Sequence, residues 1–151
     1  MKNLKKIYII SFCIIVLLTI TGCKKKKISI EEFNKKMTND GYTIKDLGEE
    51  EKIKKSSLAV DSDNQYEIYF YEFNNFDDAK SIFYDIKDSV SKLAVKGSTS
   101  GIIERKKYLK YVLTNNDYYY VISTIDNTLV FGVTNVDNKN NLKNIIKKIG
   151  Y

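Results

Sequence analysis

Two spacings of apolar residues divide most of the chain into helices and strands. Between Asn75 and Leu93 the apolar side chains recur every three or four positions while charged residues occupy the other face, which predicts an amphipathic helix. Asn75 and the aspartates close after it favour a helix N-terminus. The stretch from Leu142 to Ile149 has the same period, with two lysines in its last turn and Gly150 beyond it. Both stretches are predicted to be helices that cover a sheet.

A shorter helix is predicted ahead of these two. Residues 29–32 have the serine-to-glutamate spacing of a capping box, and Ile28 and Phe33 are placed to pack together across it. Gly41 suits the left-handed residue that commonly ends a helix. The sequence therefore predicts a helix that begins after Ser29 and ends at Gly41.

Alternating polar and apolar residues, rich in aromatic and β-branched side chains, predict the strands. The predicted strands are 56–60, 66–73, 108–114, 118–125 and 129–134. A short extended segment at 42–47 and an acidic turn at 48–51 precede them, and Gly97 to Gly101 is predicted to be a flexible loop.

These elements give the order α-β-β-α-β-β-β-α. Short links between neighbouring strands force antiparallel pairing, and amphipathic helices must cover a sheet. The sequence therefore predicts one α+β domain. We expect a two-layer sandwich of three helices on an antiparallel sheet of about five strands, somewhat like a ferredoxin-like fold with an added strand.

Alternation along the strands separates two kinds of side chain. One predicted sheet face carries Ile68, Phe70, Leu109, Leu113, Val121 and Ile125. The other carries Tyr69, Tyr71, Tyr108, Tyr118 and Tyr120. A helix layer is expected to cover the first face. The second resembles the amphipathic surfaces that bind proteins, peptides or sugars, although tyrosines also serve to stabilise strand pairs or to fill a covered face.

The first 23 residues have the order of a secretory signal. Three lysines precede an apolar run at 7–20, which would be about 21 Å long as a helix and is short for the ~30 Å hydrocarbon core of a bilayer. The run ends in Ile20-Thr21-Gly22-Cys23, which resembles the lipobox of bacterial lipoproteins. The resemblance implies cleavage between Gly22 and Cys23 and a diacylglycerol on the Cys23 thiol. Cys13 would leave with the signal peptide.

A basic cluster follows the apolar run and consists of Lys24, Lys25, Lys26 and Lys27. The positive-inside tendency would keep such a cluster in the cytoplasm, so an uncleaved signal anchor is the alternative. In a lipoprotein the same lysines either add attraction to an anionic leaflet, on the order of 1 kcal/mol each, or form a solvated spacer. The predicted division is a signal peptide at 1–22, a lipidated basic tether at 23–27 and an extracytoplasmic domain at 28–151. The chain is thus expected on the outer face of a bacterial cell membrane.

Composition narrows the setting and the partners. The chain has no Pro, His or Trp and is rich in Lys, Ile and Asn, which favours a Gram-positive host. The formal net charge is +6, but seven of the 25 basic residues precede Ile28, which leaves 18 basic and 19 acidic residues. Because the remaining domain is near neutral, no nucleic-acid partner is predicted.

Several common chemistries lack their residues. The sequence has no His and no Cys after Cys23, so it cannot build the usual triads, ordinary zinc sites or a disulfide. Thr99 stands at the nucleophile position of a G-x-S-x-G outline, but no base is present to activate it. We therefore assign no catalytic residue, metal or cofactor from the sequence.

One acidic stretch partly matches a calcium loop. Asp61, Asp63, Gln65, Glu67 and Glu72 fall at the liganding positions of such a loop. Tyr66 stands where a calcium loop requires glycine, so a hairpin turn is the preferred interpretation.

Three functions remain open. The leading hypothesis is a lipid-anchored binding or accessory module that recruits a protein, peptide or cell-wall partner through the tyrosine-rich face. The alternatives are an enzyme that uses carboxylates or a bound cation around Asp61, Asp63 and Glu67, and a structural envelope protein.

Overall fold

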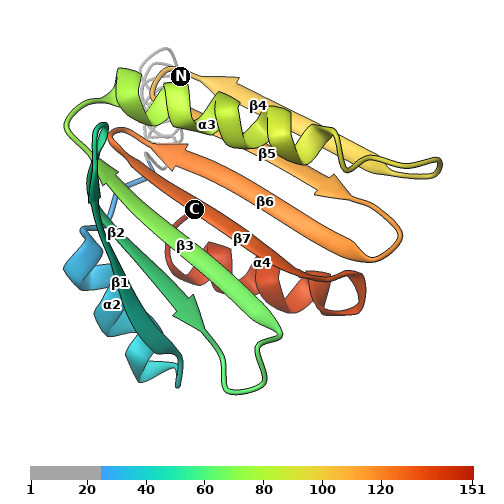
Figure 1. Ribbon diagram of the computed structural model, residues 1–151, viewed down its shortest axis with the longest axis horizontal. Coiled ribbons are helices and arrows are strands. Elements are labelled where there is room, and N and C mark those ends of the chain that lie inside the picture. The colour runs from blue at the N-terminus through green and yellow to red at the C-terminus, as the bar shows by residue number, and fades with distance from the viewer. Residues whose placement is uncertain (1–24) are drawn as a thin grey trace, which may run out of the picture.

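A single antiparallel sheet of seven strands carries helices on both faces (Figure 1). The computed structural model describes residues 25–151, so the predicted signal peptide, Cys23 and Lys24 lie outside the described residues. The elements are α2 (Ile30–Asn39), β1 (Thr43–Glu50), β2 (Ile53–Val60), β3 (Tyr66–Phe73), α3 (Phe76–Ser91), β4 (Thr99–Arg105), β5 (Tyr108–Thr114), β6 (Tyr118–Ile125), β7 (Thr128–Asn135), a 3-10 turn (Val136–Asn138) and α4 (Lys139–Lys148). None of the helices within 25–151 has the length and apolar character needed to cross a membrane.

The helix ends carry the caps that the sequence predicts. The Ser29 hydroxyl accepts a hydrogen bond from the Glu32 amide at 3.2 Å, and Asn75 caps α3 in the same way. Gly41 adopts φ +87°, which permits the amide of Tyr42 to reach the Met37 carbonyl at 3.0 Å. Local sequence therefore fixes where α2 begins and ends.

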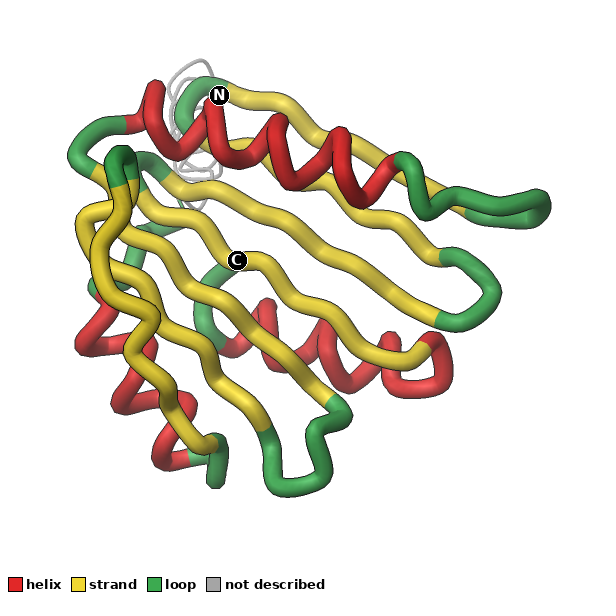
Figure 2. The backbone as a smooth tube through the Cα atoms, in the orientation of Figure 1, coloured by secondary structure: helices red, strands yellow, loops and turns green. Residues whose placement is uncertain are grey.

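The sheet consists of two meanders joined at its centre (Figure 2). Strands β1, β2 and β3 form the first, and β4, β5, β6 and β7 form the second. Helix α3 carries the chain from the centre of the sheet to its far edge, and β7 then returns to pair with β3. The strand order is β1-β2-β3-β7-β6-β5-β4.

Two hydrophobic clusters lie on opposite faces of the sheet. Helices α2 and α4 cover one face, where Phe33 of α2 stacks on Phe70 of β3 with ring centres 4.7 Å apart. Helix α3 covers part of the other face, where Phe83 packs with Ile122 and Leu129. The sheet is therefore the middle layer of three.

The predicted sandwich is wrong in strand number and in layering. The chain is α+β with three helices in the described residues, but the sheet has seven strands, and its order does not fit a ferredoxin-like arrangement. The two strands that the prediction did not count are the edge strands β1, for which it gave only a short extended segment at 42–47, and β4. Almost every residue of β1 and every residue of β4 is exposed. Because neither strand has a buried face, neither shows the alternation that reveals a strand.

The predicted loop and turn next to these edges are also corrected. The second half of Gly97 to Gly101 is the start of β4, which pairs with β5 in unbroken register. The acidic turn at 48–51 is mostly the end of β1, where Gly48 at φ +82° interrupts the register with β2. Turn-forming residue types at these positions thus lie in irregular or exposed strand.

Candidate anion-binding groove

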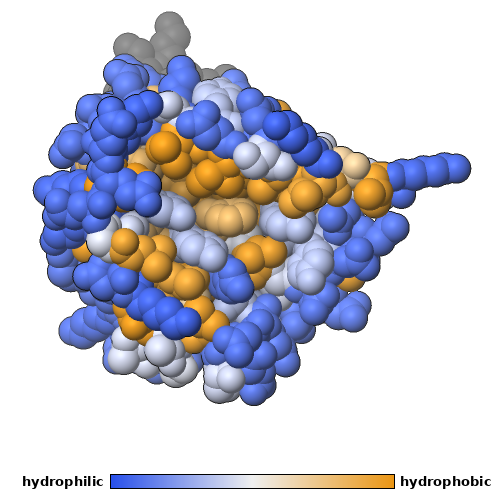
Figure 3. Space-filling view, viewed as in Figure 1, coloured by the Kyte–Doolittle hydropathy of each residue, from blue (hydrophilic) through white to orange (hydrophobic). Residues whose placement is uncertain are grey.

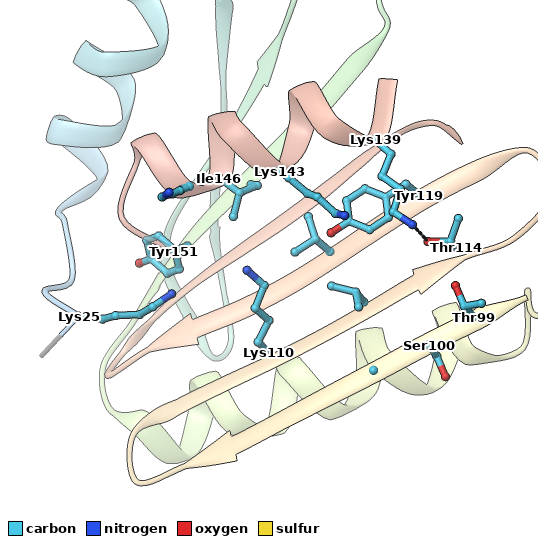
Figure 4. A pocket seen from close by; sticks show the side chains of 14 residues that line it. Lys25, Thr99, Ser100, Lys110, Thr114, Tyr119, Lys139, Lys143, Ile146 and Tyr151 are labelled. Atoms are coloured by element: carbon cyan, nitrogen blue, oxygen red, sulfur yellow. Dashed lines mark hydrogen bonds between the residues drawn. The ribbon is translucent and has the colours of Figure 1, made fainter. Parts of the chain in front are cut away.

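A groove of about 660 Å³ lies between α4 and strands β4, β5 and β6 (Figure 4). It exists because α4 packs on β7 and leaves the outer part of the sheet face uncovered. The side chains that line it come from the N-terminal segment, the three strands, α4 and the C-terminal residue. They include Lys25, Thr99, Lys110, Val112, Tyr119, Lys139, Lys143, Lys147 and Tyr151.

Gly132 of β7 sets how close α4 approaches the sheet. A Cβ atom at this position would lie 3.2 Å from Cδ1 of Leu142 and 3.2 Å from Cγ1 of Val121. Such distances are tighter than most side-chain contacts, so glycine allows Leu142 to pack closely on the strand without displacing its neighbours. This contact fixes the helix that forms one wall of the groove.

Five lysines line the groove, and we call them the groove lysines. They are Lys25, Lys110, Lys139, Lys143 and Lys147. Three of them recur at every fourth residue of α4 and therefore lie along one side of that helix. Lys110 comes from β5 on the opposite wall, and Lys25 comes from the segment that follows the predicted lipidation site.

Neutral groups hold the cations at the two ends of the groove. Lys139 donates to the Thr114 hydroxyl at 2.9 Å, and its ammonium lies 5.4 Å from the centre of the Tyr119 ring. Lys143 lies 5.7 Å from the same ring. At the other end Lys25 donates to the Tyr108 hydroxyl at 3.0 Å and lies 4.5 Å from that ring centre. Aromatic rings and hydroxyls orient an ammonium without cancelling its charge.

No carboxylate neutralises these cations. The groove lining contains no Asp or Glu, and every ion pair among residues 25–151 involves a lysine other than the groove lysines. Lys148, next to Lys147, pairs with Asp40 at 2.6 Å. Positive charge therefore collects on one side of a domain whose total charge is near zero.

Lys110 is partly buried on the β5 side of the groove. Its side chain is half-buried on the groove wall, and none of the described residues forms a hydrogen bond or an ion pair with its ammonium. Burial lowers the pKa of Lys110, and the nearby charges of Lys25 and Lys143 lower it further, while Tyr108 acts in the opposite direction. Negative charge placed in the groove would relieve this repulsion.

The pKa values of Tyr108 and Tyr119, which lie beside the groove lysines, shift in opposite directions. Burial works to raise the pKa of Tyr108, but the hydrogen bond from Lys25 and the charge of Lys110 outweigh it, so the pKa falls below its ordinary value. Burial raises the pKa of Tyr119 to about 12, so its hydroxyl stays protonated. Tyr119 thus presents a neutral ring beneath two ammonium groups.

The floor of the groove is apolar but closed. Val121, Ile146, Tyr119 and Tyr151 are each at most 3% exposed. The stems of the groove lysines lie over this floor, since all of these residues line one cavity. A ligand therefore meets the apolar stems of the lysines, their ammonium groups and the Thr99 hydroxyl of β4.

The structure separates the five tyrosines that the sequence placed on one face. Tyr69, Tyr71, Tyr118 and Tyr120 lie on the α3 side of the sheet, where Tyr69 stacks on Phe131 with ring centres 5.7 Å apart. Figure 3 shows apolar side chains gathered in the hollow beside α3 on this face.

Tyr108 lies on the other face and borders the groove. The prediction assigned the side chains of β5 to the wrong faces of the sheet. Tyr108 pairs with Ile125 and Leu109 with Thr124, so Leu109 and Leu113 share a face with the other four tyrosines. Alternation orders side chains within a strand, but pairing register decides which face each set joins.

The predicted tether packs against the domain where it is described. Lys27 donates to Oδ1 of Asn127 at 2.5 Å and lies 3.8 Å from a carboxylate oxygen of Asp126. Ile28 is buried beside α4. The predicted lipid attachment at Cys23 is therefore two residues from a groove lysine, or at most about 7 Å of extended chain.

The candidate calcium register forms a turn in the structure. Asp61 accepts a hydrogen bond from the Tyr66 amide at 2.9 Å, and Glu67 accepts one from the Tyr69 hydroxyl at 2.9 Å. No group of three His, Cys, Asp or Glu residues in the part of the chain that the structure describes could hold a metal ion. Thr99 lies on the exposed edge strand.

Sequence reasoning missed the groove because it summed charge along the chain. The available signal was the spacing of Lys139, Lys143 and Lys147, since like charges four residues apart destabilise an isolated helix by a few tenths of a kcal/mol per pair. The contributions of Lys110 and Tyr119 depend on strand pairing and carry no local signal.

Comparison with known proteins leaves the family open. No family model matches the chain, and no curated protein matches it. Among solved structures, it is similar to the crystal structure of a GTP binding regulator from Thermotoga maritima, at 14% identity and a TM-score of 0.47. The match covers 82% of this chain and 85% of that one. A likeness this distant carries no argument about function.

Proposed function

We propose that the protein is a binding module that holds an anionic ligand in the groove beside α4, at the outer face of the cell membrane. One observation carries the proposal. Five lysines surround a single cavity, and no Asp or Glu side chain lines it. Cations without partners cost free energy in the empty protein, and an anion of the right shape recovers it.

The size and shape of the groove support binding. A cavity of about 660 Å³ falls within the range of small-molecule sites. The β-sheet and the contact of α4 at Gly132 make its walls rigid, which lowers the entropy that a ligand must overcome. Lysine also binds phosphate readily, as a point charge with three donors.

The membrane location is part of the same proposal and rests on the lipobox-like residues Ile20 to Cys23. A diacylglycerol on Cys23 would hold the groove within a few residues of the lipid surface. The ligand would then be an extracytoplasmic anion, met at the cell surface. Lys24 and Lys26 would add attraction to an anionic leaflet.

An NMR titration with inorganic pyrophosphate tests the proposal. We expect the amide resonances of groove residues such as Gly101, Lys110 and Lys143 to shift on titration. The double variant Lys110→Gln with Lys143→Gln should lose these shifts. The control is Lys54→Gln with Lys148→Gln, which removes the same charge from lysines that pair with carboxylates outside the groove.

The control variant distinguishes binding in the groove from binding that depends only on the total charge of the protein. We expect the control variant to bind pyrophosphate as the wild type does. Equal loss of binding in both double variants would mean that only total charge matters, and the proposed site would fall.

A second candidate is the recruitment of a protein or peptide by the tyrosine face, for which the partly exposed cluster of Tyr69, Tyr71, Tyr118, Tyr120 and Phe131 is the favouring observation. Tyr118 is 44% exposed. Tyr69→Ala with Tyr120→Ala should abolish capture of a partner if this face binds one. Unchanged capture by that variant would remove the candidate.

A further inference from the structure

We infer that the ligand of the groove is a linear polyanion, a polymer with repeated phosphate groups, and not a single small anion or a lipid. This inference rests on the proposed function, since it names the class of ligand for the same groove. Two observations support the inference: the groove lysines are spread along a line, and the residues beneath them are buried.

The groove lysines form a line. Lys139, Lys143 and Lys147 follow α4 at intervals of four residues, which is ~6 Å per step and ~12 Å in all. Figure 4 shows Lys139 beside Thr114 at one end, Lys25 near Tyr151 at the other end, and Lys110 and Lys143 between them. A site for one small anion would bring its donors together at a point. Cations spread along a groove match negative groups spread along a chain.

The partners of the end lysines keep them apart. Thr114 and the Tyr119 ring hold Lys139, whereas the hydroxyl and ring of Tyr108 hold Lys25. Neither ammonium can turn toward the centre without losing these contacts. The two end ammonium groups are thus held too far apart for one short anion to contact both.

The closed floor argues against a lipid. An acyl chain needs accessible apolar surface. Val121, Ile146, Tyr119 and Tyr151 are only 1% to 3% exposed, so the apolar surface that stays open in the groove belongs largely to side chains such as the lysine stems, which end in a charge. Binding a chain there would require displacing lysine stems. A polyanion needs only the ammonium groups of the lysines that line the groove.

The edge of the sheet leaves room for a long ligand. Strand β4 forms one margin of the groove and is exposed along its whole length. The hydroxyl of Thr99 lies at this margin and can donate to phosphate oxygens, whereas Ser100 points to the other face of the sheet. A polymer can therefore pass along the groove and continue beyond it.

Calorimetric titration of the lipidated full-length protein tests the inference. The probes are base-free sugar phosphodiester oligomers with one, two, four or six phosphates, at low salt. We expect affinity to rise roughly tenfold or more between one and four phosphates, because each added contact is intramolecular. Lys25→Gln and Lys139→Gln, at opposite ends, should each weaken the four-phosphate oligomer several-fold and leave the single phosphate unchanged. Lys148→Gln on the same helix is the matched control.

Each other outcome overturns a defined part of the account. Equal affinity for one and four phosphates would overturn the polymer and leave the anion site in place. No binding of any oligomer, together with a null pyrophosphate titration, would overturn both. The protein can also be placed in vesicles of neutral lipid or of phosphatidylglycerol. If it binds the oligomers in neutral vesicles but not in phosphatidylglycerol vesicles, the anionic leaflet itself occupies the groove, and the polymer proposal is overturned.

Discussion

The ammonium of Lys148 lies 2.6 Å from Oδ1 of Asp40, an ion pair that joins the last turn of α4 to the C-terminal end of α2. Lys147, one residue earlier, lines the groove and has no such partner among the described residues. Neighbouring lysines on one helix thus differ in whether their charge is cancelled. The arrangement leaves one side of α4 positive and ties the other side into the fold.

The contact at Gly132 should be sensitive to one methyl group. Gly132→Ala places a Cβ atom 3.2 Å from the side chains of Leu142 and Val121, which must shift to accommodate it, so we expect a loss of about 1 kcal/mol in the free energy of unfolding. Gly101→Ala is the control, since its nearest neighbour, Cγ2 of Val112, is 3.7 Å away. Urea denaturation measures both, and equal stabilities would contradict the close approach.

Removing the charge of Lys110 should stabilise the empty protein. Lys110→Met keeps an apolar stem on the groove wall and removes an unpartnered, half-buried cation, so we expect the free energy of unfolding to rise by up to about 1 kcal/mol. Pyrophosphate binding should weaken in the same variant. Urea denaturation measures the stability and titration measures the binding. Higher stability together with weaker binding is the result expected if Lys110 serves a ligand site. A less stable variant would mean that the charge serves the fold.

Glu31 supplies a prediction about pH. The hydrogen bond from Lys55, followed by those from the Glu31 backbone and Ser29, lowers the pKa of this exposed carboxyl to about 2. Its ordinary value is 4.5, so its small contribution to stability is complete above that pH and is lost as the pH falls toward 2.

A carboxyl-carbon NMR titration checks this pKa. Lys55→Gln should return the pKa of Glu31 toward its ordinary value, whereas Lys54→Gln, which removes the lysine near Glu72, should leave it low. An unchanged pKa in Lys55→Gln would show that the ion pair is not its cause.

Mass spectrometry tests the predicted lipid anchor at Cys23. Mass spectrometry of the protein from its membrane fraction should show a diacylated Cys23 as the first residue, and Cys23→Ala should abolish the modification. An intact Met1 in the wild type would instead indicate an uncleaved anchor, and the proposed extracytoplasmic ligand would have to be abandoned.

The sequence predicted the elements whose residues carry their own pattern. Amphipathic α3 and the caps at Ser29 and Asn75 are local features and appear where expected. Strands β1 and β4 were missed because both lie at exposed edges, where nothing selects for alternation. The number of layers was wrong for another reason: the sequence does not show which face of the sheet each helix covers, and α3 lies on the face opposite α2 and α4.

The groove could be predicted only in part, for a related reason. The lysines of α4 are visible as a stripe, but the approach of Lys110 and Tyr119 depends on the register of β5 and β6. The phase of β5 decided which face held Tyr108, and the sequence contains no local signal for that phase. Charge summed over the chain also concealed charge gathered in space.

The most direct test of the central claim is the salt dependence of binding. For the four-phosphate oligomer, we predict that the slope of log affinity against log salt concentration becomes shallower by roughly 0.7 when Lys143 is changed to Gln, because one fewer phosphate is contacted. Lys148→Gln should leave the slope unchanged, since its charge is paired with Asp40. Equal slopes for wild type and Lys143→Gln, or equal changes in the two variants, would contradict an anion site in the groove.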